Sequence, residues 1–212
     1  DYNKGTLTNI KQFISFAKKL NKPIIIDPKG NDYSKYAGAT FITPNLKEFH
    51  QIAESALNIK DLILSARKIL KKLNIQNILI TRGKKGMILI SETDVVNLPA
   101  IAKEVYDVTG AGDTVVAVIA ASIGNNIPTH IATKLSNIAA SQVVSKIGNS
   151  YVTEKDLRKM FYKDELYTKK INFSNKKNIV SSKKILTNLN KSIVMTNGCF
   201  DIIHSGHVHL FE

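Results

Sequence analysis

The chain has 212 residues, a formal net charge of +13 and a hydrophobic fraction of 43%. This composition is typical of a globular protein and excludes a disordered chain, and no apolar stretch reaches the roughly 20 residues of a membrane helix. The charge does not indicate nucleic-acid binding, because eleven basic residues against three acidic ones gather between Lys155 and Lys191 without a recognisable nucleic-acid-binding motif. A solvated basic linker explains the excess better.

The start of the chain has neither an initiator methionine nor the basic and apolar regions of a signal peptide. We therefore expect it to be the middle of a longer protein. The single cysteine, Cys199, cannot form an internal disulfide bond, which fits a reducing compartment. We predict a cytoplasmic protein that has no membrane partner and binds no nucleic acid.

Helix-like and strand-like patterns alternate along the first 150 residues. Helices are predicted over residues 7–20, from 46 onward, and over 61–73, 114–123 and 127–146. Asp61 is the expected cap of the third helix, and the fourth is apolar all round, which predicts a helix buried in the core. Strands are predicted over residues 24–26, 39–43, 77–81 and 87–90, with a hairpin turn between Gly83 and Gly86.

This alternation predicts a layered α/β domain with a largely parallel sheet. In such sheets ligands gather at the carboxyl ends of the strands. Polar turns follow four strand-like runs, at residues 27–30, 44–48, 82–86 and 107–113, and these turns can converge on one site.

The pattern weakens after Val152. Residues 158–180 are rich in lysine and asparagine and show little apolar periodicity, so we interpret them as a linker. Order is predicted to return with a short helix over 181–189 and a strand over 192–196, and the chain then stops inside what looks like a new helix.

The first chemical motif is the string from Asp107 to Thr114, Asp-Val-Thr-Gly-Ala-Gly-Asp-Thr. Gly110 and Gly112 at a helix start let backbone N–H groups approach an anion, and the helix dipole adds partial positive charge there. Asp113 is placed to accept a proton from a hydroxyl that attacks a phosphate. A glycine-rich turn with Asp113 as a helix cap is the alternative.

The full string resembles the C-terminal signature of the ribokinase-like (PfkB) sugar kinases. The resemblance implies that Asp113 is the catalytic base and that Gly110, Ala111 and Gly112 form an anion hole for the transferred phosphoryl group. Asn45 and Glu48 match the Asn-x-x-Glu element of that family, whose glutamate helps to organise Mg²⁺ and the phosphates. A first-turn helix residue favoured by the dipole is the alternative for Glu48.

Further positions fit the nucleotide side of the same family. The resemblance assigns a nucleotide-binding loop to Thr81, Arg82, Gly83 and Gly86. Without it these residues form a hairpin turn. Asn137 falls where related kinases wall the adenine pocket, although ordinary helix packing explains it almost equally well. Lys29 can reach a phosphate or remain a solvent-exposed turn residue.

The second motif combines a strand end with a helix start near the end of the chain. Its residues are Asn197, Gly198, Phe200, His204, Gly206 and His207. Gly206 leaves room for a triphosphate at the helix start, and the two histidines can donate hydrogen bonds to phosphate oxygens. Zinc binding is the alternative, but no further ligands at suitable spacing complete a site. The string resembles the His-x-Gly-His signature of nucleotidyltransferases.

The order of the two motifs resembles the bifunctional heptose-phosphate kinase and adenylyltransferase family of Gram-negative bacteria. It implies a ribokinase-like domain over residues 1–157, the linker over 158–180 and the first strand and helix start of a Rossmann-like nucleotidyltransferase domain over 181–212. The implied reactions phosphorylate C1 of D-glycero-β-D-manno-heptose 7-phosphate and, after a separate phosphatase has acted, transfer AMP to heptose 1-phosphate, giving ADP-heptose for lipopolysaccharide core synthesis. The implied ligands are a sugar phosphate, ATP and Mg²⁺, and the implied parent is a homodimer.

Two expectations concern the fragment itself. Because half of the kinase and most of the second domain are absent, we expect this chain alone to complete neither reaction. We also expect the segment after about Ser192 to be disordered, to dock on the kinase part or to pair with another chain. Another sugar kinase of the same family, or a module that binds ATP without turnover, remains the alternative.

Overall fold

The computed structural model describes residues 9–53, 58–102, 105–146, 148 and 150–168, with 162–168 described by backbone only, and the single residues 180, 183, 187 and 206. Backbone contacts divide the chain into two units, residues 1–158 and 159–212. The first unit contains the sheet and the first five α-helices. Among the described residues no helix is long and apolar enough to cross a membrane.

A mixed five-stranded sheet forms the centre of the first unit, and its strands follow one another in chain order. The strands are β1 (Ile25–Ile26), β2 (Phe41–Ile42), β3 (Asn77–Thr81), β4 (Met87–Ser91) and β5 (Val95–Leu98). The first three pair in parallel and the last three in antiparallel fashion. The layered α/β architecture is confirmed. The prediction of a largely parallel sheet is wrong, because the hairpin after β3 makes β4 run antiparallel to β3, and β5 runs antiparallel to β4. The sequence pattern does not predict β5.

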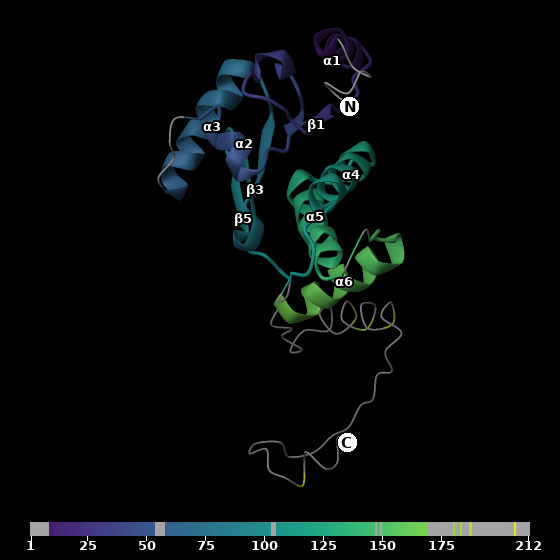
Figure 1. The fold of residues 1–212 in the computed structure, drawn as a ribbon. Coiled ribbons are helices and arrows are strands. Elements are labelled where there is room, and N and C mark those ends of the chain that lie inside the picture. The colour runs from purple at the N-terminus through teal and green to yellow at the C-terminus, as the bar shows by residue number, and fades with distance from the viewer. Residues whose placement is uncertain are drawn as a thin grey trace. The chain divides into compact units, whose positions relative to one another are not determined.

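Helices cover both faces of the sheet (Figure 1). They are α1 (Ile10–Lys19), α2 (Leu46–His50), α3 (Ile59–Leu73), α4 (Ala111–Gly124), α5 (Thr129–Val144) and α6 (Glu154–Thr168), with 3-10 turns η1 (Ser34–Tyr36) and η2 (Gly83–Lys85). The first three α-helices pack on one face, and α4 and α5 pack on the other.

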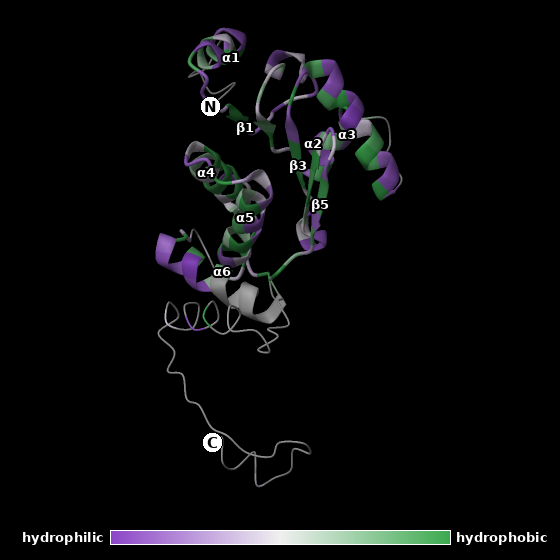
Figure 2. Ribbon diagram, turned by 180° about the vertical axis from the view of Figure 1, so that it is seen from behind, coloured by the Kyte–Doolittle hydropathy of each residue, from purple (hydrophilic) through white to green (hydrophobic). Residues whose placement is uncertain are grey.

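The alternation of side chains along the strands creates the two cores. In β3, Ile78 and Ile80 face the α1–α3 side, whereas Leu79 faces α4 and α5. In β4, Ile88 and Ile90 also face the α1–α3 side. All five side chains are almost fully buried. Figure 2 shows the strands in hydrophobic green and a polar outer side on α3, as expected for a sheet covered on both faces.

Two predictions about helices need correction. Helix α3 is capped by Asn58, whose side chain accepts from the backbone N–H of Asp61 at 3.0 Å, so Asp61 is a first-turn residue and not the cap. Helix α4 is buried on one side only: Val115 and Ile119 are in the core, whereas the Ala117 position is exposed. Within the described residues, α4 is covered by α5 and the sheet but not on its opposite side.

Helix α6 extends into the stretch that the sequence pattern interpreted as a linker from residue 158. Its start is fixed locally, because the Thr153 and Asp156 side chains each accept from the other residue's backbone N–H. An ion pair of 2.7 Å between Arg158 and Glu154, four residues apart, adds support on the helix surface. Capping hydrogen bonds and a surface ion pair can stabilise a helix that has no apolar stripe, and without such a stripe the sequence pattern does not predict the helix. The proposed domain boundaries stay predictions.

Candidate active site

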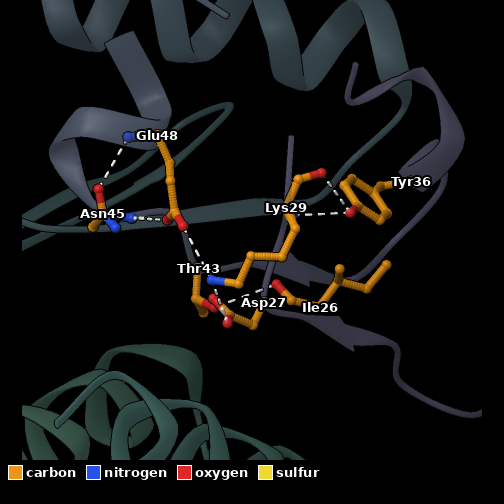
Figure 3. Close-up of polar contacts among 7 residues, drawn as sticks. All are labelled: Ile26, Asp27, Lys29, Tyr36, Thr43, Asn45 and Glu48. Atoms are coloured by element: carbon orange, nitrogen blue, oxygen red, sulfur yellow. Dashed lines mark hydrogen bonds and ion pairs between the residues drawn. The ribbon is translucent and has the colours of Figure 1, made fainter. Parts of the chain in front are cut away.

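A lysine bridges two carboxylates at the carboxyl ends of β1 and β2 (Figure 3). The Lys29 Nζ lies 3.0 Å from Asp27 Oδ2 and 3.0 Å from Glu48 Oε1. Asp27 directly follows β1, and Glu48 lies in α2, which begins shortly after β2. Parallel pairing of Ile26 with Ile42 brings these two strand ends to the same edge of the sheet.

Glu48 is held in place by a capping box. The Asn45 side chain accepts from the Glu48 backbone N–H at 3.0 Å, and Glu48 Oε2 accepts from the Asn45 backbone N–H at 2.8 Å. This arrangement satisfies two backbone donors at the start of α2 and fixes the carboxylate. Glu48 is therefore a first-turn helix residue, as the alternative interpretation expects, and at the same time it presents its other oxygen to Lys29.

The backbone of the strand-end turn is also anchored. The Tyr36 hydroxyl accepts from the Lys29 backbone N–H at 2.9 Å and donates to the Lys29 carbonyl at 3.1 Å. The buried Thr43 hydroxyl donates to the carbonyl of Ile26 at 3.3 Å, which ties the ends of β1 and β2 together. Tyr36 and Thr43 were not predicted as site residues, because a hydroxyl that binds backbone leaves no motif in the sequence.

Electrostatics favours the charged form of the lysine. Partial burial alone would lower the pKa of Lys29, but the hydrogen bonds and charges of Asp27 and Glu48 outweigh burial and raise that pKa above its ordinary value. The three groups together carry one net negative charge. They can accept additional positive charge, as from a hydrated metal ion.

Thr81 connects this group to the predicted nucleotide loop. Its backbone N–H donates to the Pro44 carbonyl at 3.1 Å, and it forms a parallel bridge with Asn45. The loop that follows contains Arg82, whose guanidinium donates to the Lys85 carbonyl at 3.0 Å and to the Asn97 side chain. Burial lowers the pKa of Arg82. The predicted hairpin is confirmed, whereas nucleotide binding by it stays a prediction.

Gly86 closes the hairpin in a conformation that requires glycine. Its φ is +76°, and a Cβ at this position would collide with the backbone of Leu98, Pro99 and Ala100. Gly83 also has a positive φ, of +57°, but open space around it. The two glycines therefore differ: Gly86 is fixed by close packing within the chain, and Gly83 only by its turn.

Asn137 has a structural partner. Its side-chain amide donates to the Pro99 carbonyl at 2.9 Å, and the residue is 6% exposed. This bond ties α5 to the end of β5. The packing interpretation of Asn137 accounts for that bond, and an adenine-pocket role stays a prediction.

The glycine turn lies at the start of α4. Gly110 is the N-cap residue, with a φ of +75°, and Asp113 is an exposed residue in the first turn. The interpretation of Asp113 as the helix cap is therefore wrong. Because the first N–H groups of a helix have no intrahelical acceptor, those of Gly112 and Asp113 can bind an anion.

The segment before the turn is held by local hydrogen bonds. The Tyr106 backbone N–H donates to the Val144 carbonyl at 2.8 Å, at the end of α5. Asp107 Oδ1 accepts from the Thr109 backbone N–H at 2.8 Å, and this bond is the main cause that lowers the pKa of Asp107. The backbone before the turn is therefore held in place, and the Asp107 carboxylate stabilises the turn by accepting from the Thr109 N–H.

The second motif lies almost wholly outside the described residues. Of its members only Gly206 is described, as helical and exposed. Outside them also lie most of the predicted helix over 181–189 and the whole of the predicted strand over 192–196. The expectation that the segment after about Ser192 is disordered, docks or pairs with another chain falls on the same residues and stays a prediction. In the described part of the chain, no group of three or more His, Cys, Asp or Glu side chains could hold a metal ion.

Residues 4–156 match the pfkB family carbohydrate kinases. Over its full length the chain is similar to the bifunctional protein HldE of Coxiella burnetii, with 43% identity over 219 residues, and to that of Haemophilus ducreyi, with 40% identity over 213 residues. The chain spans 44% of the length of each of these curated relatives.

Solved structures share the fold. Ribokinase of Arabidopsis thaliana, in complex with ribose and ATP, has a TM-score of 0.65 and 25% identity over 72% of this chain and 51% of that one. Phosphofructokinase-2 of Escherichia coli, in complex with potassium, has a TM-score of 0.64 and 19% identity over 72% of this chain and 50% of that one. The predicted ribokinase-like fold is confirmed for the first unit.

Proposed function

This chain belongs to the pfkB family of carbohydrate kinases, and from that premise we propose that it carries the phosphate-handling part of an ATP-dependent sugar kinase. The observation that carries the proposal is the fixed position of Glu48 beside Asp27 at the carboxyl edge of the sheet. Ligand sites of open α/β sheets lie at this edge. The glycine turn at the start of α4 is the proposed anion site, because the backbone N–H groups of a helix start can bind a phosphate.

The donor set at the strand ends fits Mg²⁺. Two carboxylates are available, and a lysine ammonium already lies between them as a stand-in cation. Mg²⁺ keeps several of its own waters and is commonly held by one or two carboxylates together with substrate phosphates. Asp27 and Glu48 would hold it, and when bound with ATP it would neutralise charge that develops on the phosphoryl oxygens.

The remaining chemistry belongs to residues at the start of α4. The Asp113 carboxylate accepts the proton of the attacking sugar hydroxyl as that oxygen bonds to the γ-phosphorus and the bond to ADP breaks. The predicted anion hole is Gly110, Ala111 and Gly112; the Ala111 N–H donates to the Val108 carbonyl at 3.3 Å, so the N–H groups of Gly112 and Asp113 are the ones we propose to bind the phosphoryl group. Gly112 is consistent with this role: apart from its chain neighbours and the backbone of its own helix, a Cβ there would meet no atom of the described chain within 4 Å, so packing against other elements does not require glycine. Close approach of a phosphate to the backbone would explain why glycine occupies position 112.

We further propose that the substrate of the longer protein is a heptose phosphate. The relatives that match the whole chain are named as bifunctional, and their similarity extends over the second motif. We propose that the longer protein transfers the γ-phosphoryl group of ATP to C1 of heptose 7-phosphate. After a separate phosphatase has hydrolysed the 7-phosphate, it transfers AMP from a second ATP to heptose 1-phosphate with the help of His204 and His207, giving ADP-heptose and releasing pyrophosphate. A cytoplasmic location, a homodimer and a role in lipopolysaccharide core synthesis belong to the same proposal.

The experiment is a calorimetric titration of the 212-residue chain with ATP in the presence of Mg²⁺. The test variant is Gly112→Asp, and Gly124→Asp is the matched control, because Gly124 also lies in α4, is exposed and has open space around it. Loss of binding in Gly112→Asp alone supports the proposed site. Equal binding by both variants, or no binding by the unmodified chain, would contradict it.

A further inference from the structure

Glu48 keeps its position without help from the lysine, and the backbone that carries Asp27 is restricted. Glu48 is fixed by its second oxygen, which accepts from the Asn45 backbone N–H. Asp27 precedes Pro28, and a residue before proline is restricted to extended backbone. A cation that replaced the ammonium would therefore find the Glu48 carboxylate still in place, with Asp27 on a restricted backbone beside it.

Lys29, in contrast, is anchored at its backbone and movable at its head. Its N–H and carbonyl are both bound by the Tyr36 hydroxyl. Its side chain is 48% exposed, and its flexible four-carbon stem ends in a strongly hydrated point charge. The ammonium can therefore swing away from the carboxylates while the turn that carries it stays fixed (Figure 3).

The charge of the group indicates that it can take a further cation. One ammonium faces two carboxylates, so a divalent cation would balance their charge better than Lys29 does. The buried Tyr33 hydroxyl, which has no hydrogen-bond partner among the described residues, feels the negative charges of Glu48 and Asp27, which contribute, after burial itself, to raising the pKa of Tyr33.

Resting on the proposed function, we propose that Lys29 is a displaceable internal counterion: its ammonium occupies, between Asp27 and Glu48, the place of the divalent cation, and it leaves when that cation binds. In the metal-free protein Lys29 prevents repulsion between the two carboxylates. Once released, the ammonium can pair with a phosphate oxygen of the incoming anionic substrate. Cation binding and the Lys29 ion pairs are therefore mutually exclusive.

The test is a titration of the 212-residue chain with Mn²⁺, which takes the same oxygen ligands as Mg²⁺, followed by electron paramagnetic resonance without nucleotide. Lys29→Met should bind Mn²⁺ about three- to tenfold more tightly than the unmodified chain, because the competing charge is gone. Lys29→Arg, which restores the charge, should return the affinity toward the unmodified value. Lys47→Met, a matched loss of an exposed lysine on α2, should change the affinity by no more than about twofold.

Thermal unfolding provides a second readout. Without divalent cations Lys29→Met should unfold at a lower temperature than the unmodified chain, and Mg²⁺ should reverse this loss, since a ligand that binds only the folded state stabilises it. Unchanged or weaker Mn²⁺ binding by Lys29→Met would overturn the inference.

Glu48→Gln separates failure of the inference from failure of the proposed function. If this variant weakens Mn²⁺ binding while Lys29→Met does not tighten it, the cation uses Glu48 but Lys29 is no competitor, and the inference alone fails. If Glu48→Gln leaves Mn²⁺ binding unchanged, or no variant binds Mn²⁺, the proposed cation site and the inference both fail.

Discussion

Tyr33 and Tyr36 meet edge to face, with ring centroids 5.7 Å apart and an interplanar angle of 73°, yet their hydroxyl groups are in opposite situations. The Tyr36 hydroxyl binds both the N–H and the carbonyl of Lys29. The Tyr33 hydroxyl is buried without a hydrogen-bond partner among the described residues. The same substitution should therefore have different consequences at the two positions.

We expect Tyr36→Phe to lower the free energy of unfolding by about 1–3 kcal/mol, because two backbone groups of Lys29 lose their partner. Tyr33→Phe keeps the ring packing and removes a polar atom that is buried unpaired, so it should be neutral or stabilising by about 1 kcal/mol. Urea denaturation of both variants measures the difference. Equal destabilisation by the two substitutions would mean that the Tyr33 hydroxyl has a partner in solution.

Alkaline pH should destabilise the protein through Tyr33. Burial, followed by the negative charges of Glu48 and Asp27, raises the pKa of Tyr33 above its ordinary value. A group whose pKa is higher in the folded state contributes stability that is complete below the unfolded pKa and is lost as the pH rises above about 10. Stability measured between pH 8 and 11 should fall less steeply in Tyr33→Phe than in the unmodified chain. Parallel curves would show that Tyr33 does not titrate differently on folding.

The strand-end group illustrates what the sequence could and could not predict. Asn45 and Glu48 were predictable because a capping box is local, with both partners within one helical turn. The bridge from Lys29 to Glu48 was not, because it spans 19 residues and depends on the register that pairs Ile26 with Ile42. The sequence alone therefore does not decide whether Lys29 contacts a phosphate or is a solvent-exposed turn residue.

The same distinction holds for the fold. Strands β3 and β4 were predictable because continuous runs of isoleucine and leucine serve two buried faces. Strand β5 was missed because its residues alternate between exposed and half-buried positions at the sheet edge, which gives a weak apolar signal. The cap of α3 was misplaced because Asn58 and Asp61 both suit a helix start, and only the hydrogen bond between them decides which one is the cap.

Gly86 and Gly83 should respond differently to alanine. Gly86→Ala places a Cβ against the backbone of Leu98 and Pro99 at a positive φ, so we expect a loss of more than about 3 kcal/mol or failure to fold. Gly83→Ala, which meets no neighbour within 4 Å, should cost only about 1 kcal/mol for its positive φ. Denaturant midpoints of the two variants check this order. A Gly86→Ala protein as stable as Gly83→Ala would contradict the close packing of this hairpin against the end of β5.

Asp113 should separate ATP binding from turnover. It is exposed in the first turn of α4 and does not cap the helix, so Asp113→Asn should leave both the fold and the ATP affinity of this chain nearly unchanged. In the longer protein, supplied with heptose 7-phosphate, the same substitution should lower kcat by about 10²- to 10⁴-fold, since it removes the general base. A variant with normal kcat would show that another group accepts the proton.

Gly112 should show opposite effects on stability and on ligand binding. Within the described chain a Cβ at Gly112 meets no atom within 4 Å, and alanine is favoured over glycine in helices. Gly112→Ala should therefore raise the free energy of unfolding by up to about 1 kcal/mol without ligand, while it weakens ATP binding by shielding the backbone N–H groups. Gly110→Ala is the contrasting variant, because the φ of +75° at Gly110 should make it lose about 1–2 kcal/mol. Unfolding curves with and without Mg-ATP measure both quantities on the same samples. If Gly112→Ala gained stability and bound ATP as well as the unmodified chain, the glycine would not serve a phosphate, and the anion hole would have to lie elsewhere.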